Sequence, residues 1–178
     1  MSKQNPFDVE RLLPAVQRYA RVLTRSGVEA DDLAQEALLR AYEKRRSFDG
    51  SRSLLSWLLS IVHNLFIDRA RRRSVEARVH DTLSAMAALL PPAMEADTRL
   101  RLQALLAGFE ALPDEQRAAL HLVVIEGLSY QEAATTLDIP VGTLMSRLAR
   151  ARGALRALDS ADPLPTRPVL KLVRGEHD

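Results

Sequence analysis

The sequence of 178 residues contains no cysteine, which excludes a disulfide framework, cysteine-ligated zinc and thiol chemistry. Aromatic residues make up only 4% of the chain, a proportion that suits helices built from leucine and alanine. No apolar run is long enough to span a bilayer, and the polar start, residues 1–5, lacks the pattern of a signal peptide. We therefore expect a cytoplasmic protein with no membrane insertion.

Strand signals and catalytic signals are also missing. No segment alternates between apolar and polar residues at period two for long enough to predict a sheet, so we expect an all-α fold. No glycine-rich phosphate loop is present, and the histidines show no metal-ligand spacing. The sequence therefore predicts a chain that is not an enzyme and has no catalytic residue, metal or cofactor. The histidines are His63, His80, His121 and His177.

The net charge of +2 is too small to indicate a nucleic-acid-binding protein by itself. Nearly all the positive charge is arginine rather than lysine, however, and the guanidinium group favours bidentate contacts with phosphates and base edges. The hydrophobic fraction of 47% is ample for a folded core, and the length allows one domain or two small ones.

Residues 128–152 contain the most informative pattern, which predicts two short helices joined by a tight turn. Ser129, followed three residues later by Glu132, forms a capping box, so a helix is expected to begin there. The Asp-Ile-Pro run at 138–140 ends this helix, because proline lacks an amide donor and restricts the residue before it. A second helix is expected to begin near Val141.

The second of these helices carries an apolar stripe and an adjoining polar face at helical spacing. A major-groove recognition helix needs both, because the stripe holds the helix on its domain while donors and cations reach bases and phosphates. The alternative is an ordinary helical hairpin with a solvated arginine face. The stripe comprises Leu144, Leu148, Ala151 and Leu155, and the polar face comprises Thr143, Ser146, Arg147 and Arg150.

Two helices are predicted near the N-terminus. The first runs from about Phe7 to Arg25 and is expected to end at Gly27. The second starts at about residue 29 or 31, ends at Lys44, and has acidic residues crowded into its first turn, where they complement the helix dipole.

A third long helix follows a break at residues 45–55 and ends in the basic run Arg69–Arg73. Such a run is often a solvated helix end that complements the helix dipole. Beside a loop with Phe48 and a helix with Trp57, the combination looks more like a groove for a nucleic-acid backbone.

Residues 74–96 are predicted to be a flexible linker, because the helical pattern weakens there and a Pro-Pro pair interrupts it. The helical pattern returns at residues 97–112, and a further helix is expected to open at Pro113 and end at Gly127. Residues 159–178 are proline-rich and are predicted to form a disordered tail.

Three runs of residues in this order resemble the extracytoplasmic-function (ECF) sigma factors, the smallest group of sigma-70-type subunits of bacterial RNA polymerase. Residues 30–42 resemble the family's region 2.2, residues 47–72 its regions 2.3 and 2.4, and residues 112–148 its region 4. The resemblance covers residues 9–73 and 97–158. A helix-turn-helix alone is shared by many regulators, whereas three matching runs with this gap are specific.

The resemblance implies two small helical domains joined by the linker, with region 2 at residues 7–73 and region 4 at residues 97–158. It implies promoter-specific transcription initiation, with core RNA polymerase, promoter DNA and an anti-sigma factor as partners. On the polymerase, the expected surfaces are the beta-prime clamp helices and the beta flap. The residues expected to bind the clamp helices are Asp32, Gln35, Glu36 and Arg40, for which the alternative is an acid-rich helix start on a solvated surface.

The resemblance also implies separate contacts with two promoter elements. The loop at residues 48–55 is expected to hold a flipped base of the −10 element, with Trp57 in the core or at the pocket floor. Region 4 is expected to read a GGAAC-like −35 element through Thr143, Ser146, Arg147 and Arg150. The residues expected at the −10 element are Phe48, Asn64, Asp68, Arg69, Arg71, Arg72 and Arg73.

Two alternatives remain open. The first is a stand-alone helix-turn-helix regulator that works without polymerase, which would need a dimer interface or an effector pocket. The second is an adaptor that mimics a sigma factor and sequesters an anti-sigma partner. The presence of Arg147, Arg150 and the run at 69–73 counts against the adaptor, since such a mimic need not keep DNA-facing cations.

Overall fold

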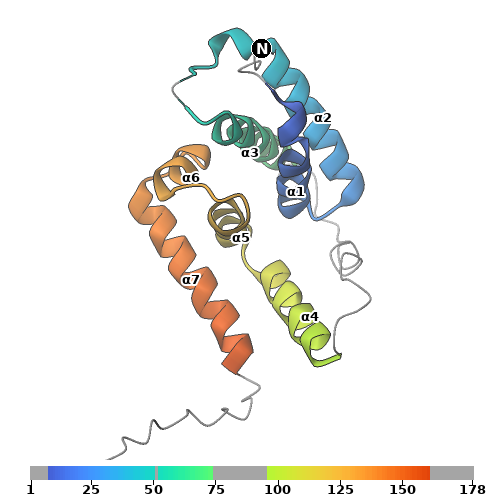
Figure 1. The fold of residues 1–178 in the computed structure, drawn as a ribbon, viewed down its shortest axis with the longest axis vertical. Helices are drawn as coiled ribbons and strands as arrows, with labels where there is room; N and C mark the ends of the chain where they lie inside the picture. The colour runs from blue at the N-terminus through green and yellow to red at the C-terminus, as the bar shows by residue number, and fades with distance from the viewer. Residues whose placement is uncertain (1–7, 51, 74–95, 161–178) are drawn as a thin grey trace, which may run out of the picture.

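The computed structural model describes residues 8–50, 52–73 and 96–160, and Figure 1 shows their arrangement. The predicted linker and the predicted disordered tail lie outside these residues, except for the last position of the linker and the first two positions of the tail. Ala96 already belongs to a helix, and another helix extends to Ser160, two residues into the predicted tail.

Every regular element in the described part of the chain is a helix, which confirms the all-α prediction. Short helical turns connect several of the longer helices. In chain order the elements are η1 (Glu10–Leu12), α1 (Leu13–Thr24), α2 (Gly27–Glu43), η2 (Arg45–Ser47), α3 (Leu54–Arg73), α4 (Ala96–Ala111), α5 (Asp114–Leu120), the π-helical turn η4 (His121–Ile125), α6 (Tyr130–Thr136) and α7 (Val141–Ser160).

The junction between α1 and α2 differs from the prediction that Gly27 ends the first helix. Arg25 ends it instead, in the left-handed conformation with φ of 57°, and its N–H donates to the carbonyl of Arg21 at 3.0 Å. Ser26 then caps α2 by accepting a hydrogen bond from the N–H of Glu29, and Gly27 is the first residue of α2. A non-glycine residue in this conformation costs free energy, which tertiary contacts of its side chain offset here.

The N-terminal domain is formed by α1, α2 and α3, which pack on one another around their buried faces. Alanines on the buried face of α2 let the neighbouring helices approach closely, and leucines fill the remaining space. The largest fully buried side chains include Tyr19, Leu33, Leu58 and Leu59.

The C-terminal domain is built on α7, which packs against α5, α4 and α6. The predicted capping box is present at the start of α6, since Ser129 accepts from the N–H of Glu132 at 3.2 Å and the Glu132 carboxylate accepts from the N–H of Ser129 at 2.9 Å. The turn after α6 contains Asp138 in the left-handed conformation, with φ of 52°. Leu144, Leu148 and Ala151 are buried, which confirms most of the predicted stripe.

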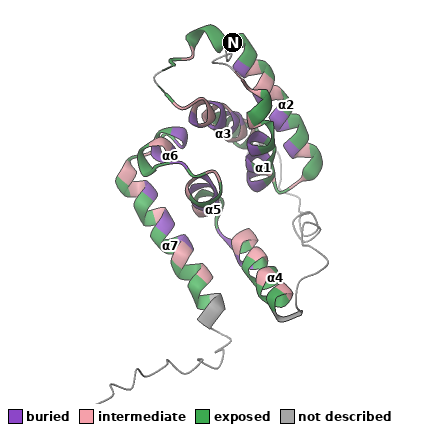
Figure 2. Ribbon diagram, in the orientation of Figure 1, coloured by how far each residue is buried: buried purple, intermediate pink, exposed green. Residues whose placement is uncertain are grey.

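The two domains pack directly against each other. Helix α1 contacts α5 and η4, and α3 contacts α6. A continuous cluster of buried apolar side chains runs through both domains, and Figure 2 shows purple, buried segments on α1, α3, α5 and α6. This packing brings faces of α3 and α7 to a common cleft.

Candidate nucleic-acid and polymerase interfaces

Helix α2 presents a mixed polar and apolar face to solvent. Asp32 and Gln35 are exposed, as predicted. Leu39 and Tyr42 are 67% and 62% exposed, so two large apolar side chains flank the predicted polar contacts. Neither residue was among the predicted contacts, although both lie outside the buried face of α2, as their sequence positions could have indicated. Such a face suits a protein partner, because apolar area and polar groups are present together.

The predicted polymerase-binding and −10 residues meet at Glu36. One carboxylate oxygen of Glu36 accepts a hydrogen bond from Arg40 at 3.0 Å, and the other accepts from Arg69 on α3. The hydrogen bond from Arg69 is the main cause that holds the pKa of Glu36 below its usual range. Glu36 therefore couples the exposed face of α2 to the basic end of α3.

The candidate −10 residues lie along α3 and the loop before it. The ring centroids of Phe48 and Trp57 are 5.2 Å apart and the rings are tilted by 54°, at a separation typical of aromatic pairs. Trp57 is half-buried, in keeping with a place at a pocket floor. Asn64 and Asp68 are exposed one turn apart on α3. Further along the same helix Arg69 is half-buried and Arg71 and Arg72 are exposed, while the side chain of Arg73 lies outside the described ones.

The candidate −35 residues occupy the first half of α7. Ser146 and Arg150 are exposed, and Thr143 is half-buried. The Ser146 hydroxyl donates to the carbonyl of Thr143 at 2.8 Å. Its proton is therefore used within the helix, while its oxygen can still accept a hydrogen bond. Arg147 is only 20% exposed, and its guanidinium pairs with Glu115 of α5 at 2.7 Å.

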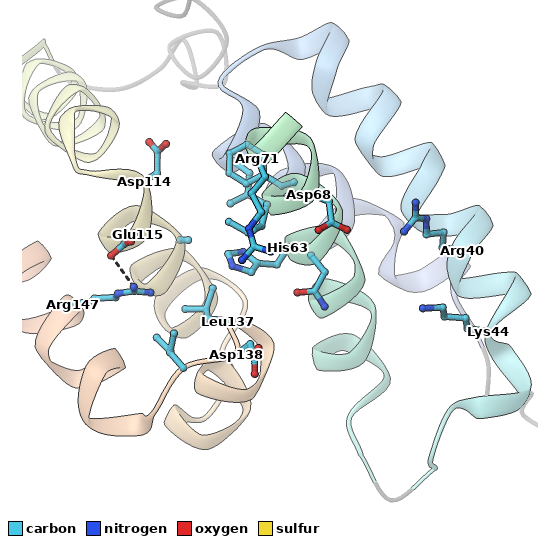
Figure 3. Close-up of a pocket in the computed structure, with 16 residues that line it drawn as sticks. Arg40, Lys44, His63, Asp68, Arg71, Asp114, Glu115, Leu137, Asp138 and Arg147 are labelled. Carbon is cyan, nitrogen blue, oxygen red and sulfur yellow. Dashed lines mark ion pairs between the residues drawn. The ribbon is translucent and has the colours of Figure 1, made fainter. Parts of the chain in front are cut away.

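A cleft of about 580 Å³ lies between the two domains and receives residues from both predicted DNA-binding sets. Asn64, Asp68 and Arg71 line it from α3, and Arg147 and Glu115 line it from the other side (Figure 3). The lining does not include the remaining −10 candidates or the other three −35 candidates. The fold therefore brings together parts of two sets that sequence reasoning assigned to separate promoter elements.

His63, on the wall of this cleft, was not predicted to have a role. Its Nδ1 is 3.0 Å from the Tyr19 hydroxyl, and burial, assisted by the positive charge of Arg147, lowers the pKa of His63 to about 4. The imidazole is therefore neutral at neutral pH. A lone histidine on an amphipathic helix carries no signal for such an environment, because the neighbours come from α1 and α7.

Among the described residues, no helix is both long and apolar enough to cross a membrane.

Comparison with known proteins identifies the family to which these two helical domains belong. Residues 9–75 match the family model of sigma-70 region 2, and residues 102–155 match that of sigma-70 region 4. These matches fall on the N-terminal and C-terminal helical domains, so the fold is the two-domain arrangement of a sigma-70-type transcription initiation factor.

Individual relatives narrow the family. The chain is 38% identical over 153 residues to the ECF RNA polymerase sigma factor EcfG of Rhodopseudomonas palustris (strain TIE-1), covering 85% of this chain and 82% of EcfG. It is 33% identical over 145 residues to the ECF RNA polymerase sigma factor SigM of Bacillus subtilis (strain 168), covering 80% of this chain and 87% of SigM. The chain belongs to the ECF family of RNA polymerase sigma factors, and its function is promoter-specific transcription initiation with core polymerase.

Solved structures agree with this assignment. The sigma factor RpoE in complex with the anti-sigma factor NepR from Bartonella quintana matches with a TM-score of 0.72 and 29% identity, over 88% of this chain and 96% of that one. CnrH in complex with the cytosolic domain of CnrY matches with a TM-score of 0.60 and 27% identity, over 87% of this chain and 86% of that one.

Proposed function

We propose that residues 7–73 bind core polymerase and open the −10 element, and that residues 97–158 read the −35 element. The chain performs this work in the cytoplasm and catalyses no reaction of its own, because the polymerase supplies the chemistry. The observation that carries the proposal is that α2, α3 and α7 each expose part of one predicted contact set. The exposed members are Asp32 and Gln35 on α2, Asn64, Asp68, Arg71 and Arg72 on α3, and Ser146 and Arg150 on α7.

The polymerase contact is assigned to α2. Asp32, Gln35, Glu36 and Arg40 supply the polar interactions with the beta-prime clamp helices, and Leu39 and Tyr42 supply apolar area beside them. Exposed apolar side chains next to charged ones support this assignment, because docking on a protein partner removes their apolar area from water. Val124 and Ile125, 57% and 56% exposed on η4, are candidates for contact with the beta flap.

The −10 contact is assigned to α3 and the preceding loop. Phe48 and Trp57 form an aromatic wall against which an unstacked base of the non-template strand packs, and this contact offsets part of the unstacking cost. Asn64 and Asp68 face the promoter from one side of α3. The arginines at 69, 71, 72 and 73 neutralise phosphates along the same strand.

The −35 contact is assigned to α7. Arg147 and Arg150 carry the donors suited to guanine edges or phosphates, and Thr143 and Ser146 contact bases or backbone. The apolar stripe holds the helix on its domain, and Ser146 and Arg150 on the polar face are exposed to a major groove. Arg147 reaches DNA only after it leaves Glu115.

An anti-sigma factor is the proposed regulator. The sigma factor RpoE, which matches this chain over 88% of its length, was captured with the anti-sigma factor NepR. CnrH, which matches over 87% of this chain, was captured with the cytosolic domain of CnrY. We propose that this chain binds a protein of the same functional class in the arrangement in which its two domains are packed together.

Transcription in vitro with core polymerase and a library of randomised promoters tests the proposal. Recovered promoters are expected to share two elements at fixed spacing, because two weak contacts multiply only when the protein fixes their separation. A chain that binds DNA tightly alone, fails to retain core polymerase in a pull-down and gives no initiation would instead be a stand-alone helix-turn-helix regulator.

A further inference from the structure

The solvent-facing side of α7 is not centred on the arginine that the sequence places on it. The helix is anchored to its domain by a buried stripe that includes Leu144. Arg147 lies only about 60° around the helix from Leu144, in keeping with its half-buried position beside Glu115. Ser146 and Ala149 lie roughly 200° and 140° from the same stripe, and both are exposed. The side of α7 that faces away from the core is therefore centred on these two residues.

Two further side chains form the edges of this side. Met145 is 52% exposed on one edge, and Arg150 is exposed on the other. Residues three and four positions apart are neighbours on a helix surface, so Met145, Ser146, Ala149 and Arg150 form one continuous patch, here named the outward face of α7. The other large apolar side chains described on α7 are buried or half-buried, so a large exposed one at Met145 stands apart from the core stripe.

The outward face combines polar and apolar side chains. Arg150 is a hydrogen-bond donor. The hydroxyl proton of Ser146 is used by the carbonyl of Thr143 at 2.8 Å, so Ser146 presents an acceptor to a partner. Met145 and Ala149 have no side-chain N–H or O–H group to donate. Two of the four side chains on this face therefore have no donor to offer a base edge.

The major groove offers one base feature that suits such side chains. Each base edge presents donors and acceptors there, and thymine adds its 5-methyl group. An apolar side chain placed over a donor or acceptor would leave that group unsatisfied, whereas contact with a methyl group removes apolar area from water. Recognition helices place their N-terminal residues against base edges, and Met145 lies near the N-terminus of α7. The short side chain of Ala149 leaves room beside it.

We propose that Met145 determines promoter specificity by contacting the 5-methyl group of a thymine in the −35 element, with Ala149 giving that base room to approach. This inference rests on the proposed assignment of −35 recognition to α7. It adds a residue outside the predicted −35 set, and it gives one base pair of the element an apolar contact in place of a hydrogen bond.

Replacement of thymine by uracil tests the contact, because it removes the methyl group and keeps the hydrogen-bonding edge of the base. The probe is a promoter duplex with a GGAAC-like −35 element, which has thymines opposite its adenines. Every thymine in this element and its flanks is replaced by uracil. Holoenzyme assembled from core polymerase and the full chain is expected to bind the uracil duplex about two- to fourfold more weakly than the thymine duplex, from the burial of one methyl group. Holoenzyme with Met145→Ala is expected to bind both duplexes equally.

Two control variants separate a base contact from a structural role. Met145→Leu keeps an apolar side chain of similar volume and is expected to retain the preference for thymine. Leu100→Ala removes a 63% exposed apolar side chain from α4 of the same domain and is also expected to retain it. Uracil can alter duplex stiffness too, but it does so equally for every variant, so the difference between proteins reports on Met145. Since alanine favours helices, urea unfolding of Met145→Ala is expected to match that of wild type.

A duplex with a scrambled −35 element distinguishes the possible failures. If wild type binds it as well as the intact promoter, the proposed function falls and this inference falls with it. If wild type needs the intact element but binds the thymine and uracil duplexes equally, only this inference is overturned. An equal preference for thymine in wild type and Met145→Ala would overturn it as well. Should Met145→Ala lose all binding, Met145→Gln decides by the same criterion, because its side chain has similar length but is polar.

Discussion

Arg117 donates a hydrogen bond of 2.9 Å to the carbonyl of Val22, 95 residues earlier in the chain. This bond joins the start of α5 to the end of α1 and so ties one promoter-reading domain to the other. Burial lowers the pKa of Arg117, with help from the nearby charge of Arg25. An arginine nevertheless stays charged, and a buried charge with good partners resists separation of the domains.

Replacement of Arg117 by methionine is expected to lower the free energy of unfolding. The change keeps apolar volume but leaves the carbonyls of Val22 and Leu112 without their donor, at a cost of about 1–3 kcal/mol for each buried group left unsatisfied. Urea unfolding measures this loss. Arg101→Met, at an exposed position of α4, is the matched control. Equal stability of the two variants would contradict the role of Arg117 at the interface.

Glu36→Gln is expected to affect two steps of initiation at once. The amide cannot hold Arg40 and Arg69 as the carboxylate does, so both core affinity and opening of the −10 element are expected to fall. Core binding and permanganate reactivity of unpaired thymines measure the two effects. Glu43→Ala, an exposed acidic residue at the end of α2, serves as control. A loss confined to core affinity would show that the bridge to Arg69 has no role in opening.

The stability of the folded protein is expected to fall as the pH drops from about 6.5 towards 4. His63 is neutral in the folded protein, where its pKa is about 4, and regains an ordinary pKa near 6.5 when unfolding exposes it. The exposed state therefore binds more protons in this window, and stability present above pH 6.5 is lost on acidification. A shift of about 2.5 pKa units corresponds to roughly 3.4 kcal/mol at most, from 1.36 kcal/mol per pKa unit.

The comparison of wild type with His63→Gln isolates this effect. The groups that face His63 are the hydroxyl of Tyr19 from α1, whose pKa burial raises, and the guanidinium of Arg147 from α7. Glu36 and Glu126, with lowered pKa values, also lose stability on acidification, so only the difference between the two proteins reports on His63. Urea unfolding of both proteins is measured at pH 7 and at pH 5, and wild type is expected to lose more stability between them than His63→Gln does. The same pH dependence in the two proteins would rule out titration of His63.

Arg72→Ala is expected to weaken promoter binding by the holoenzyme almost equally for all sequences. One fewer phosphate contact should reduce the slope of log affinity against log salt by about one. Arg101→Ala, outside every predicted contact set, is expected to leave the slope unchanged. A change in promoter preference without a change in the salt slope would instead show that Arg72 contacts a base rather than a phosphate.

Local signals in the sequence predicted the helices of this fold well. The capping box at Ser129 and Glu132, the turn before Pro140 and the stripe containing Leu144 depend on residues three or four apart, which a sequence displays directly. The expectation that Gly27 ends the first helix was wrong, because Arg25 adopts the left-handed conformation. Its guanidinium is held by Asp114, 89 residues away, and no local pattern encodes that contact.

The sequence predicted which residues belong to the candidate site, but not how these residues are arranged in space. Asn64 and Arg150 are exposed on the expected helices. The pairing of Glu36 with Arg69 and the position of Arg147 beside Glu115 depend on how helices pack, so periodicity alone could not reveal them. The same holds for the contacts between the two domains, which join residues 80 to 108 positions apart in the chain.

Parallel measurement of core affinity and promoter-specific transcription for Asp32→Ala and Arg147→Ala tests the division of labour most directly. Asp32→Ala is expected to lower core affinity and leave promoter preference unchanged. Arg147→Ala is expected to leave core affinity unchanged and to weaken −35-dependent transcription, with a cost of about 1–3 kcal/mol at the contacted position. Equal loss of both activities in both variants would contradict the assignment of polymerase docking to α2 and −35 recognition to α7.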